Sequence, residues 1–222
     1  MKKLLLFIVT TLFASNLFAQ DFQNNIFGVR AGVNFSTFNT SLDLDHRTGI
    51  HAGFSYEQLL TRDLPLYLET GLHYSGKGFK NTSSVDYNSE YGHIYSETQK
   101  TSLHYLQIPL MINYKFSIGD SFAIYPSAGF YYAFAVAGNE KYTEYTKEGE
   151  AVHESVYDIF DGEFDVYKPS DFGYRITLTF AYERYVLSAG YEGGIVGLSS
   201  SVEEFGLKIT NSNIFLSLGV NF

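Results

Sequence analysis

Four polar side chains in one part of the sequence have the types that nucleophilic catalysis uses. His73 and Ser75 are two positions apart, Glu69 precedes them, and His104 lies further along the chain. Residues separated by an even number of positions share one face of a β-strand. A hydroxyl, an imidazole and a carboxylate on one face could act as nucleophile, base and orienting acid in a hydrolysis reaction. The alternative is that they belong to an ordinary polar strand face, so the orientation of the strands decides between the two interpretations.

Apolar and polar residues alternate along eight segments of the chain, and this period of two predicts β-strands with two unlike faces. In the last segment, Ile214, Leu216, Leu218 and Val220 alternate with polar or small residues up to Phe222. The predicted strands are 26–36, 49–60, 64–77, 102–116, 122–136, 171–183, 185–192 and 211–222.

The connections between these strands alternate in length. Long polar stretches at 39–47, 78–101, 138–170 and 193–210 alternate with short turns at 61–63, 117–120 and 183–184. This asymmetry is typical of bacterial outer-membrane barrels, and each segment is long enough for a tilted membrane crossing. The sequence therefore predicts an all-β fold, an eight-stranded antiparallel up-and-down transmembrane β-barrel. Its long outer loops would face outward, and its short turns and both termini would be periplasmic.

Charged residues in the middle of the strands fall on the glycine-bearing face. An Arg or Lys that faces lipid at the bilayer midplane costs about 2–4 kcal/mol, so this face must point into the barrel. A soluble lipocalin-type barrel would instead need charged residues on the outside of every strand, and these are absent. The predicted lumenal polar network consists of Arg30, Glu57, Glu69, Gln107, Arg175 and Glu192.

The interior of an eight-stranded barrel is just wide enough to be filled by side chains. Buried charges need partners, so we interpret the network as a hydrogen-bonded, ion-paired plug. A narrow channel is the alternative. The His73 and Ser75 pair is similar to the arrangement in small outer-membrane lipid A deacylases, but that chemistry requires an opening toward lipid, whereas His73 points into the lumen. We therefore assign no catalytic residue, and keep a lipid A-modifying hydrolase as a second alternative.

The N-terminus has the pattern of a secretory signal peptide. Lys2 and Lys3 precede an apolar segment at 4–13, which is too short to span a membrane, and cleavage is expected after Ala19. The predicted domains are thus a signal peptide at 1–19 and an outer-membrane β-barrel domain at 20–222. The chain contains no Cys, which excludes lipoprotein acylation, disulfides and thiolate metal sites. Its net charge of −9 argues against a nucleic-acid partner.

The segment 138–171 is rich in carboxylates and contains four tyrosines. The spacing matches no EF-hand loop, so we expect no metal site and no cofactor. A solvated acidic loop is the simplest interpretation, with weak divalent-ion bridging to lipopolysaccharide phosphates as the alternative. The tyrosines suit a protein contact.

Three stretches of the strands resemble the PorT-like outer-membrane β-barrel domain family of Bacteroidota. They are residues 28–36 (GVRAGVNFS), the Glu69 to Lys77-Gly78 pattern, and residues 105–110 (YLQIPL). Phe130 and Gly190 depart from residues usual in that family. The resemblance implies an outer-membrane barrel whose family members mostly lack an assigned role, although the named member belongs to type IX secretion and gliding. The terminal Phe222 resembles the C-terminal signal that the barrel-assembly machinery reads.

The sequence thus favours a small non-catalytic outer-membrane β-barrel that acts as a structural or interaction module. Its expected partners are outer-membrane lipid and lipopolysaccharide, the barrel-assembly machinery and, in one form of this hypothesis, a secretion or surface protein complex.

Overall fold

The computed structural model describes residues 23–40, 44–160, 167–199 and 208–222. The predicted signal peptide at 1–19 lies outside these residues. In the described part of the chain, no helix is long and apolar enough to cross a membrane. The strands there are β1 (Asn25–Asn39), β2 (Asp45–Leu59), β3 (Leu66–Ser89), β4 (Gly92–Tyr114), β5 (Phe116–Ile118), β6 (Phe122–Tyr145), β7 (Ala151–Asp158), β8 (Ser170–Tyr182), β9 (Tyr185–Gly194) and β10 (Thr210–Asn221).

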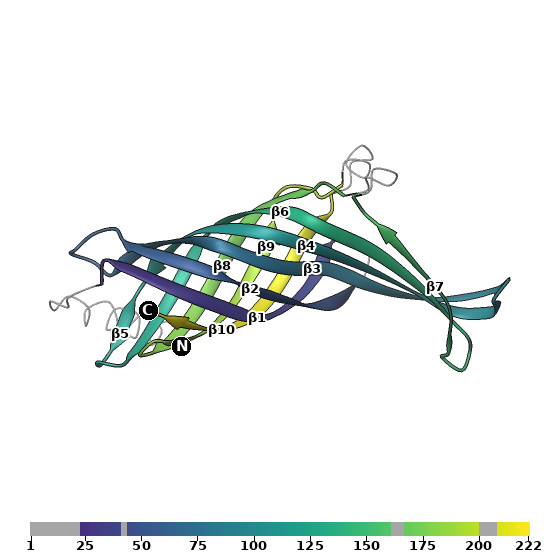
Figure 1. The fold of residues 1–222 in the computed structure, drawn as a ribbon, viewed down its shortest axis with the longest axis horizontal. Coiled ribbons are helices and arrows are strands. Elements are labelled where there is room, and N and C mark those ends of the chain that lie inside the picture. The colour runs from purple at the N-terminus through teal and green to yellow at the C-terminus, as the bar shows by residue number, and fades with distance from the viewer. Residues whose placement is uncertain (1–22, 41–43, 161–166, 200–207) are drawn as a thin grey trace, which may run out of the picture.

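Eight of these strands close into a ring. Antiparallel pairing runs through β1, β2, β3, β4, β6, β8, β9 and β10, and β10 then pairs with β1 over its full length (Figure 1). The first and last strands are also joined at their ends. The Phe27 N–H donates to the Phe222 carbonyl at 3.1 Å, and the Phe222 N–H donates to the Phe27 carbonyl at 2.8 Å. The predicted eight-stranded antiparallel barrel is confirmed.

The two faces of the barrel wall differ as the alternation predicts. Outward side chains such as Phe54 (68% exposed), Leu110 and Ile176 are apolar and exposed, as lipid contact requires. Aromatic pairs lie on this surface, including Phe122 with Tyr182. Inward positions are polar and buried. The β2–β3, β5–β6 and β8–β9 turns are short, and the C-terminal end lies at the same end of the barrel as β5 (Figure 1).

Two stretches that we predicted as loops, 78–101 and within 138–170, are partly β-structure. Strands β3 and β4 continue past the barrel as a hairpin, β6 extends to Tyr145, and β7 pairs with that extension. We call residues 80–100 of β3 and β4, residues 139–145 of β6, and β7 the outer ribbon, which projects at the end of the barrel opposite β5 (Figure 1). Both faces of these segments are mainly polar, so a search for alternating apolar and polar residues does not detect them as strands. Their Thr, Tyr and Val residues nevertheless favour strands.

Candidate functional site: a lumen filled by paired charges

All six residues of the predicted polar network lie inside the barrel. They form two levels, which we call the lower tier, toward the short turns, and the upper tier, toward the outer ribbon.

The lower tier is centred on Glu57, a carboxylate at 1% exposure. Its two oxygens face two cations: Arg30 Nη2 lies 3.8 Å from Oε1, and Lys115 Nζ lies 3.4 Å from Oε2. Glu69 is opposite Glu57 in the β2–β3 register, and its carboxylate accepts a 2.6 Å hydrogen bond from Asn113. The tier therefore contains two cations and two carboxylates.

Two aromatic rings flank the lysine of the lower tier. The Lys115 ammonium lies 4.3 Å from the centre of the Tyr67 ring and 4.6 Å from that of Tyr125. Such cation–π contacts stabilise an ammonium that has lost part of its water shell. Below them, Tyr125 packs with Ala181 and Val186 in a small apolar cluster.

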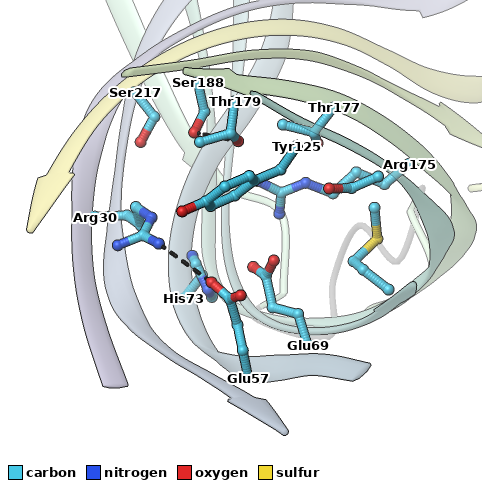
Figure 2. A pocket seen from close by; sticks show the side chains of 12 residues that line it. Arg30, Glu57, Glu69, His73, Tyr125, Arg175, Thr177, Thr179, Ser188 and Ser217 are labelled. Carbon is cyan, nitrogen blue, oxygen red and sulfur yellow. Dashed lines mark hydrogen bonds and ion pairs between the residues drawn. The ribbon is translucent and has the colours of Figure 1, made fainter. Parts of the chain in front are cut away.

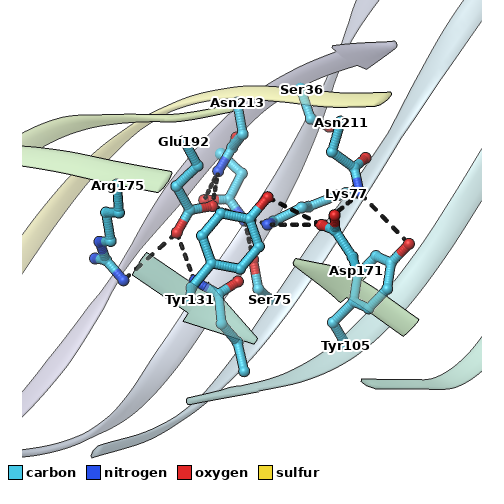
Figure 3. Close-up of polar contacts among 12 residues, drawn as sticks. Ser36, Ser75, Lys77, Tyr105, Tyr131, Asp171, Arg175, Glu192, Asn211 and Asn213 are labelled. Atoms are coloured by element: carbon cyan, nitrogen blue, oxygen red, sulfur yellow. Dashed lines mark hydrogen bonds and ion pairs between the residues drawn. The ribbon is translucent and has the colours of Figure 1, made fainter. Parts of the chain in front are cut away.

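The upper tier is centred on Glu192 (Figure 3). Lys77 Nζ lies 2.9 Å from Oε2, and Arg175 Nη1 lies 3.5 Å from Oε1. Two amides complete the shell of this carboxylate: Gln107 donates at 2.6 Å and Asn213 at 3.0 Å. A carboxylate with this many donors is held in its charged form and in one position.

A second carboxylate of the upper tier, Asp171, also faces Lys77, with Oδ2 at 3.8 Å from Nζ. The same oxygen accepts hydrogen bonds from the Tyr131 hydroxyl at 3.0 Å and the Asn211 amide at 2.8 Å. The Lys77 ammonium lies 4.3 Å from the centre of the Tyr131 ring. This tier too contains two cations and two carboxylates.

Our predicted set omitted three charged members of these tiers: Lys77, Lys115 and Asp171. The alternation itself predicts that the two lysines point inward, because their positions share the parity of the glycine-bearing face, but we did not count them in the network. Asp171 we had counted among the carboxylates of the acidic segment 138–171, although it is also the first residue of the predicted strand 171–183. It is the second residue of β8 and is fully buried. With these three residues, each tier is electrically neutral.

A small cavity lies between the tiers (Figure 2). Its volume is ≈ 20 Å³, and its lining includes Arg30, Glu57, Glu69, His73 and Arg175. This volume holds about one water molecule. Above the upper tier, an apolar cluster that includes Phe38, Phe79, Leu103 and Leu198 fills the mouth of the lumen. In the part of the chain that the structure describes, paired charges and apolar side chains therefore occupy both levels of the lumen.

The candidate hydrolytic residues are not assembled as a triad. His73 is buried in the lumen, and its Nε2 makes no hydrogen bond. The Ser75 hydroxyl accepts a 3.1 Å hydrogen bond from Asn34. Glu69 is bound to Asn113, and the His104 ring contacts the Tyr74 hydroxyl at 2.5 Å on the barrel wall.

The carboxylates of the segment 138–171 have separate surroundings. Glu140 accepts hydrogen bonds from Gln99 and Thr101 at the base of the outer ribbon, and Glu154 pairs with Lys141. Partial burial, followed by the nearby Glu140 carboxylate, raises the pKa of Tyr142 to about 12, so this phenol stays neutral. The carboxylates of residues 161–166 lie outside the described chain. Among the described residues, no group of three His, Asp or Glu side chains could hold a metal ion.

The closed ring, the apolar outer wall and the charged interior define a small outer-membrane β-barrel. The family model for the outer membrane protein beta-barrel domain matches residues 18–200, and the chain belongs to this family. No curated protein sequence matches the chain.

Solved structures with a similar course of the chain include three small bacterial barrels. The attachment invasion locus protein Ail of Yersinia pestis, in complex with the heparin analogue sucrose octasulfate, is 12% identical, with a TM-score of 0.45. That match covers 90% of this chain and 100% of Ail. Neisserial surface protein A is 14% identical, with a TM-score of 0.44 and coverage of 88% and 97%. OprG of Pseudomonas aeruginosa is 12% identical, with a TM-score of 0.38 and coverage of 90% and 97%.

Proposed function

We propose that the protein is a non-catalytic, closed barrel of the outer membrane that presents its outer ribbon to a protein partner. The observation that carries this proposal is the ribbon itself, a sheet of four strands in the order β3, β4, β6 and β7 that extends past the membrane-spanning wall. A barrel that served only to fill the membrane would not need it.

The ribbon has one face rich in tyrosine. Tyr87 donates a 2.9 Å hydrogen bond to Glu144, and Tyr91 stacks on His153 with ring centres 4.0 Å apart. Tyr157 lies on the same face and is 49% exposed. Tyrosines that are both exposed and held in place are typical of protein interfaces, because they bury a large area at a small entropic cost.

The filled lumen supports a closed barrel over a narrow channel. Any ion on the axis would have to separate Lys77 from Glu192 or Glu57 from Lys115, and would then pass the apolar cluster above. Planar-bilayer recording tests this point, and we expect no discrete conductance steps. Reproducible steps would favour the channel.

The burial of His73 and Ser75 supports a non-catalytic role. A lipid A-modifying hydrolase needs its nucleophile open to lipid, and both side chains are 4% exposed inside the lumen. We expect lipid A from cells that carry Ser75→Ala to be unchanged by mass spectrometry. If the cells that carry Ser75→Ala lacked a lipid A species that wild-type cells contain, the result would favour the enzyme.

The direction of the chain in the membrane is part of the proposal. The C-terminal end and the short turns share one end of the barrel, and the ribbon occupies the other. We infer that the short-turn end and both termini are periplasmic, and that residues 1–19 are a signal peptide. The PorT-like resemblance supports, as one form of the partner, a component of a secretion or surface machine.

A tag at Gly149 tests the partner proposal. This glycine lies in the β6–β7 turn at φ 81°, and no residue other than its two chain neighbours has an atom within 4 Å of where its Cβ would be. The tagged protein would be extracted gently from outer membranes, and the proteins that accompany it identified. We expect one stoichiometric partner, which the variant Tyr157→Ser loses.

Val156→Ser is the matched control, because Val156 neighbours Tyr157 on β7, is 58% exposed and lies on the opposite face of the ribbon. Recovery of the tagged protein alone would contradict the proposal. Equal loss of the partner with both variants would contradict the tyrosine-rich face as its docking surface.

A further inference from the structure

Three lysines form a straight row across the outer ribbon. Lys80 on β3 is directly opposite Lys100 on β4, and Lys100 is directly opposite Lys141 on β6. Their chain neighbours Phe79 and Thr101 are buried on the lumen side. The lysines therefore point away from the barrel axis, on the face opposite the tyrosines.

This row concentrates positive charge in an acidic protein. Adjacent strands are about 4.8 Å apart, so three ammonium groups originate within about 10 Å. Like charges directly opposite each other destabilise a sheet unless an anion lies between them. Lys141 pairs with Glu154 at 2.5 Å, and Asp45 lies opposite Lys80 at the end of β2. Within the described chain, the central Lys100 forms no ion pair.

Threonines follow the lysine row on the side away from the barrel. Thr82 and Thr98 occupy the next outward positions on β3 and β4 and are again in register, whereas Thr143, in register with them on β6, is buried. The hydroxyls of Thr82 and Thr98 are 3.1 Å apart. Ammonium groups beside hydroxyl donors are the groups that bind phosphate oxygens.

The row also lies just beyond the apolar wall. On β6, Phe134 and Val136 are half exposed on the outward face, and Lys141 follows Val136 after five residues. That is about 16 Å along the strand, or about 12 Å in height for a strand tilted by about 40°. A lysine stem reaches back toward the interface. The ammonium groups therefore meet the headgroup layer of the outer leaflet.

We propose that Lys80, Lys100 and Lys141 bind the phosphate groups of outer-leaflet lipopolysaccharide, with the Thr82 and Thr98 hydroxyls as additional donors. The site is a surface on the outward face of the ribbon, directly above lipid-facing side chains. An amphipathic ligand could therefore bind it with its phosphates while its acyl chains contact the barrel wall. This inference goes beyond the proposed function, which uses the other face of the ribbon, and it is tested on the purified protein without any partner.

The experiment compares binding of the detergent-refolded full barrel to bisphosphorylated lipid A, dephosphorylated lipid A and inorganic phosphate. We expect bisphosphorylated lipid A to bind at least about tenfold more tightly than the dephosphorylated form, with an affinity that falls as salt rises. The variant K80Q/K100Q should lose this preference. The matched control K147Q/K208Q, which removes two exposed lysines outside the row, should keep it.

Glu154→Gln gives an independent readout in the opposite direction. It removes the carboxylate that pairs with Lys141, so the affinity for bisphosphorylated lipid A should rise several-fold. The proposal is overturned if wild-type protein binds both lipid A forms equally, or if K80Q/K100Q retains the preference. Unchanged or weaker binding by Glu154→Gln would also overturn it. Inorganic phosphate that binds as tightly as lipid A would overturn the assignment to lipid.

Discussion

The Lys77 ammonium lies 2.9 Å from Oε2 of Glu192, and both side chains are almost completely buried in the lumen. The two residues come from β3 and β9, which are not adjacent in the barrel, so the ion pair crosses the interior. Asp171 on β8 and Arg175 on the same strand extend the contact. The upper tier therefore ties opposite sides of the barrel together as well as filling it.

Replacing Lys77 with Met should destabilise the barrel by about 3–5 kcal/mol. The change leaves Glu192 and Asp171 buried with one cation fewer, and removing one partner of a buried pair carries a cost of this size. Urea unfolding, followed by the gel mobility of the folded barrel, measures it. The exposed Lys147→Met is the control and should change stability by less than about 0.5 kcal/mol. A similar small effect for both variants would show that the ion pair does not hold the barrel together.

The two carboxylates of the lower tier should respond differently to neutralisation. Glu57→Gln removes the charge that faces both Arg30 and Lys115, and we expect a loss of about 3 kcal/mol. Glu69→Gln removes a like charge from the position opposite Glu57, and Asn113 can still bond the amide oxygen, so we expect a change below about 1 kcal/mol. The same urea assay applies. Equal losses would mean that Glu69 shares the two cations.

The sequence predicts the barrel well because lipid on one side and polar side chains on the other impose a strict period of two. It also predicts which residues face inward, including Lys77 and Lys115. It does not predict that Lys77 meets Glu192, because contacts across the lumen depend on strand stagger and not on distance along the chain. The outer ribbon escaped prediction because residues such as Thr98 and Tyr142 alternate with other polar residues. Asp171 was left out of the predicted network because it stands where the predicted strand 171–183 meets the acidic segment, and its charge was counted with that segment.

The glycine at position 32 should be necessary for barrel closure. A Cβ there would lie 2.0 Å from the Leu216 carbonyl oxygen and 2.7 Å from the Ser217 Cα, and both atoms belong to the backbone of β10. Because the backbone cannot move aside as a side chain would, Gly32→Ala should cost about 1–3 kcal/mol or more. The yield of refolded barrel in detergent measures the effect. The neighbouring Ala31→Val, on the exposed outward face, should refold normally. Normal refolding of Gly32→Ala would show that the β1–β10 seam is looser than this contact implies.

Replacing Phe222 with Ala should lower the amount of barrel inserted into the outer membrane without changing the stability of the folded barrel. The side chain is 72% exposed, whereas both hydrogen bonds to Phe27 are made by the backbone and survive the change. We therefore expect the purified variant to unfold in urea within about 1 kcal/mol of wild type. If the barrel-assembly machinery reads the terminal aromatic ring, the amount of protein in outer membranes should fall several-fold, as measured by immunoblot of membrane fractions. Deletion of residue 222 removes the ring and the two hydrogen bonds together, so it should lower both quantities. An Ala variant that is inserted at the wild-type level would remove Phe222 from the assembly signal.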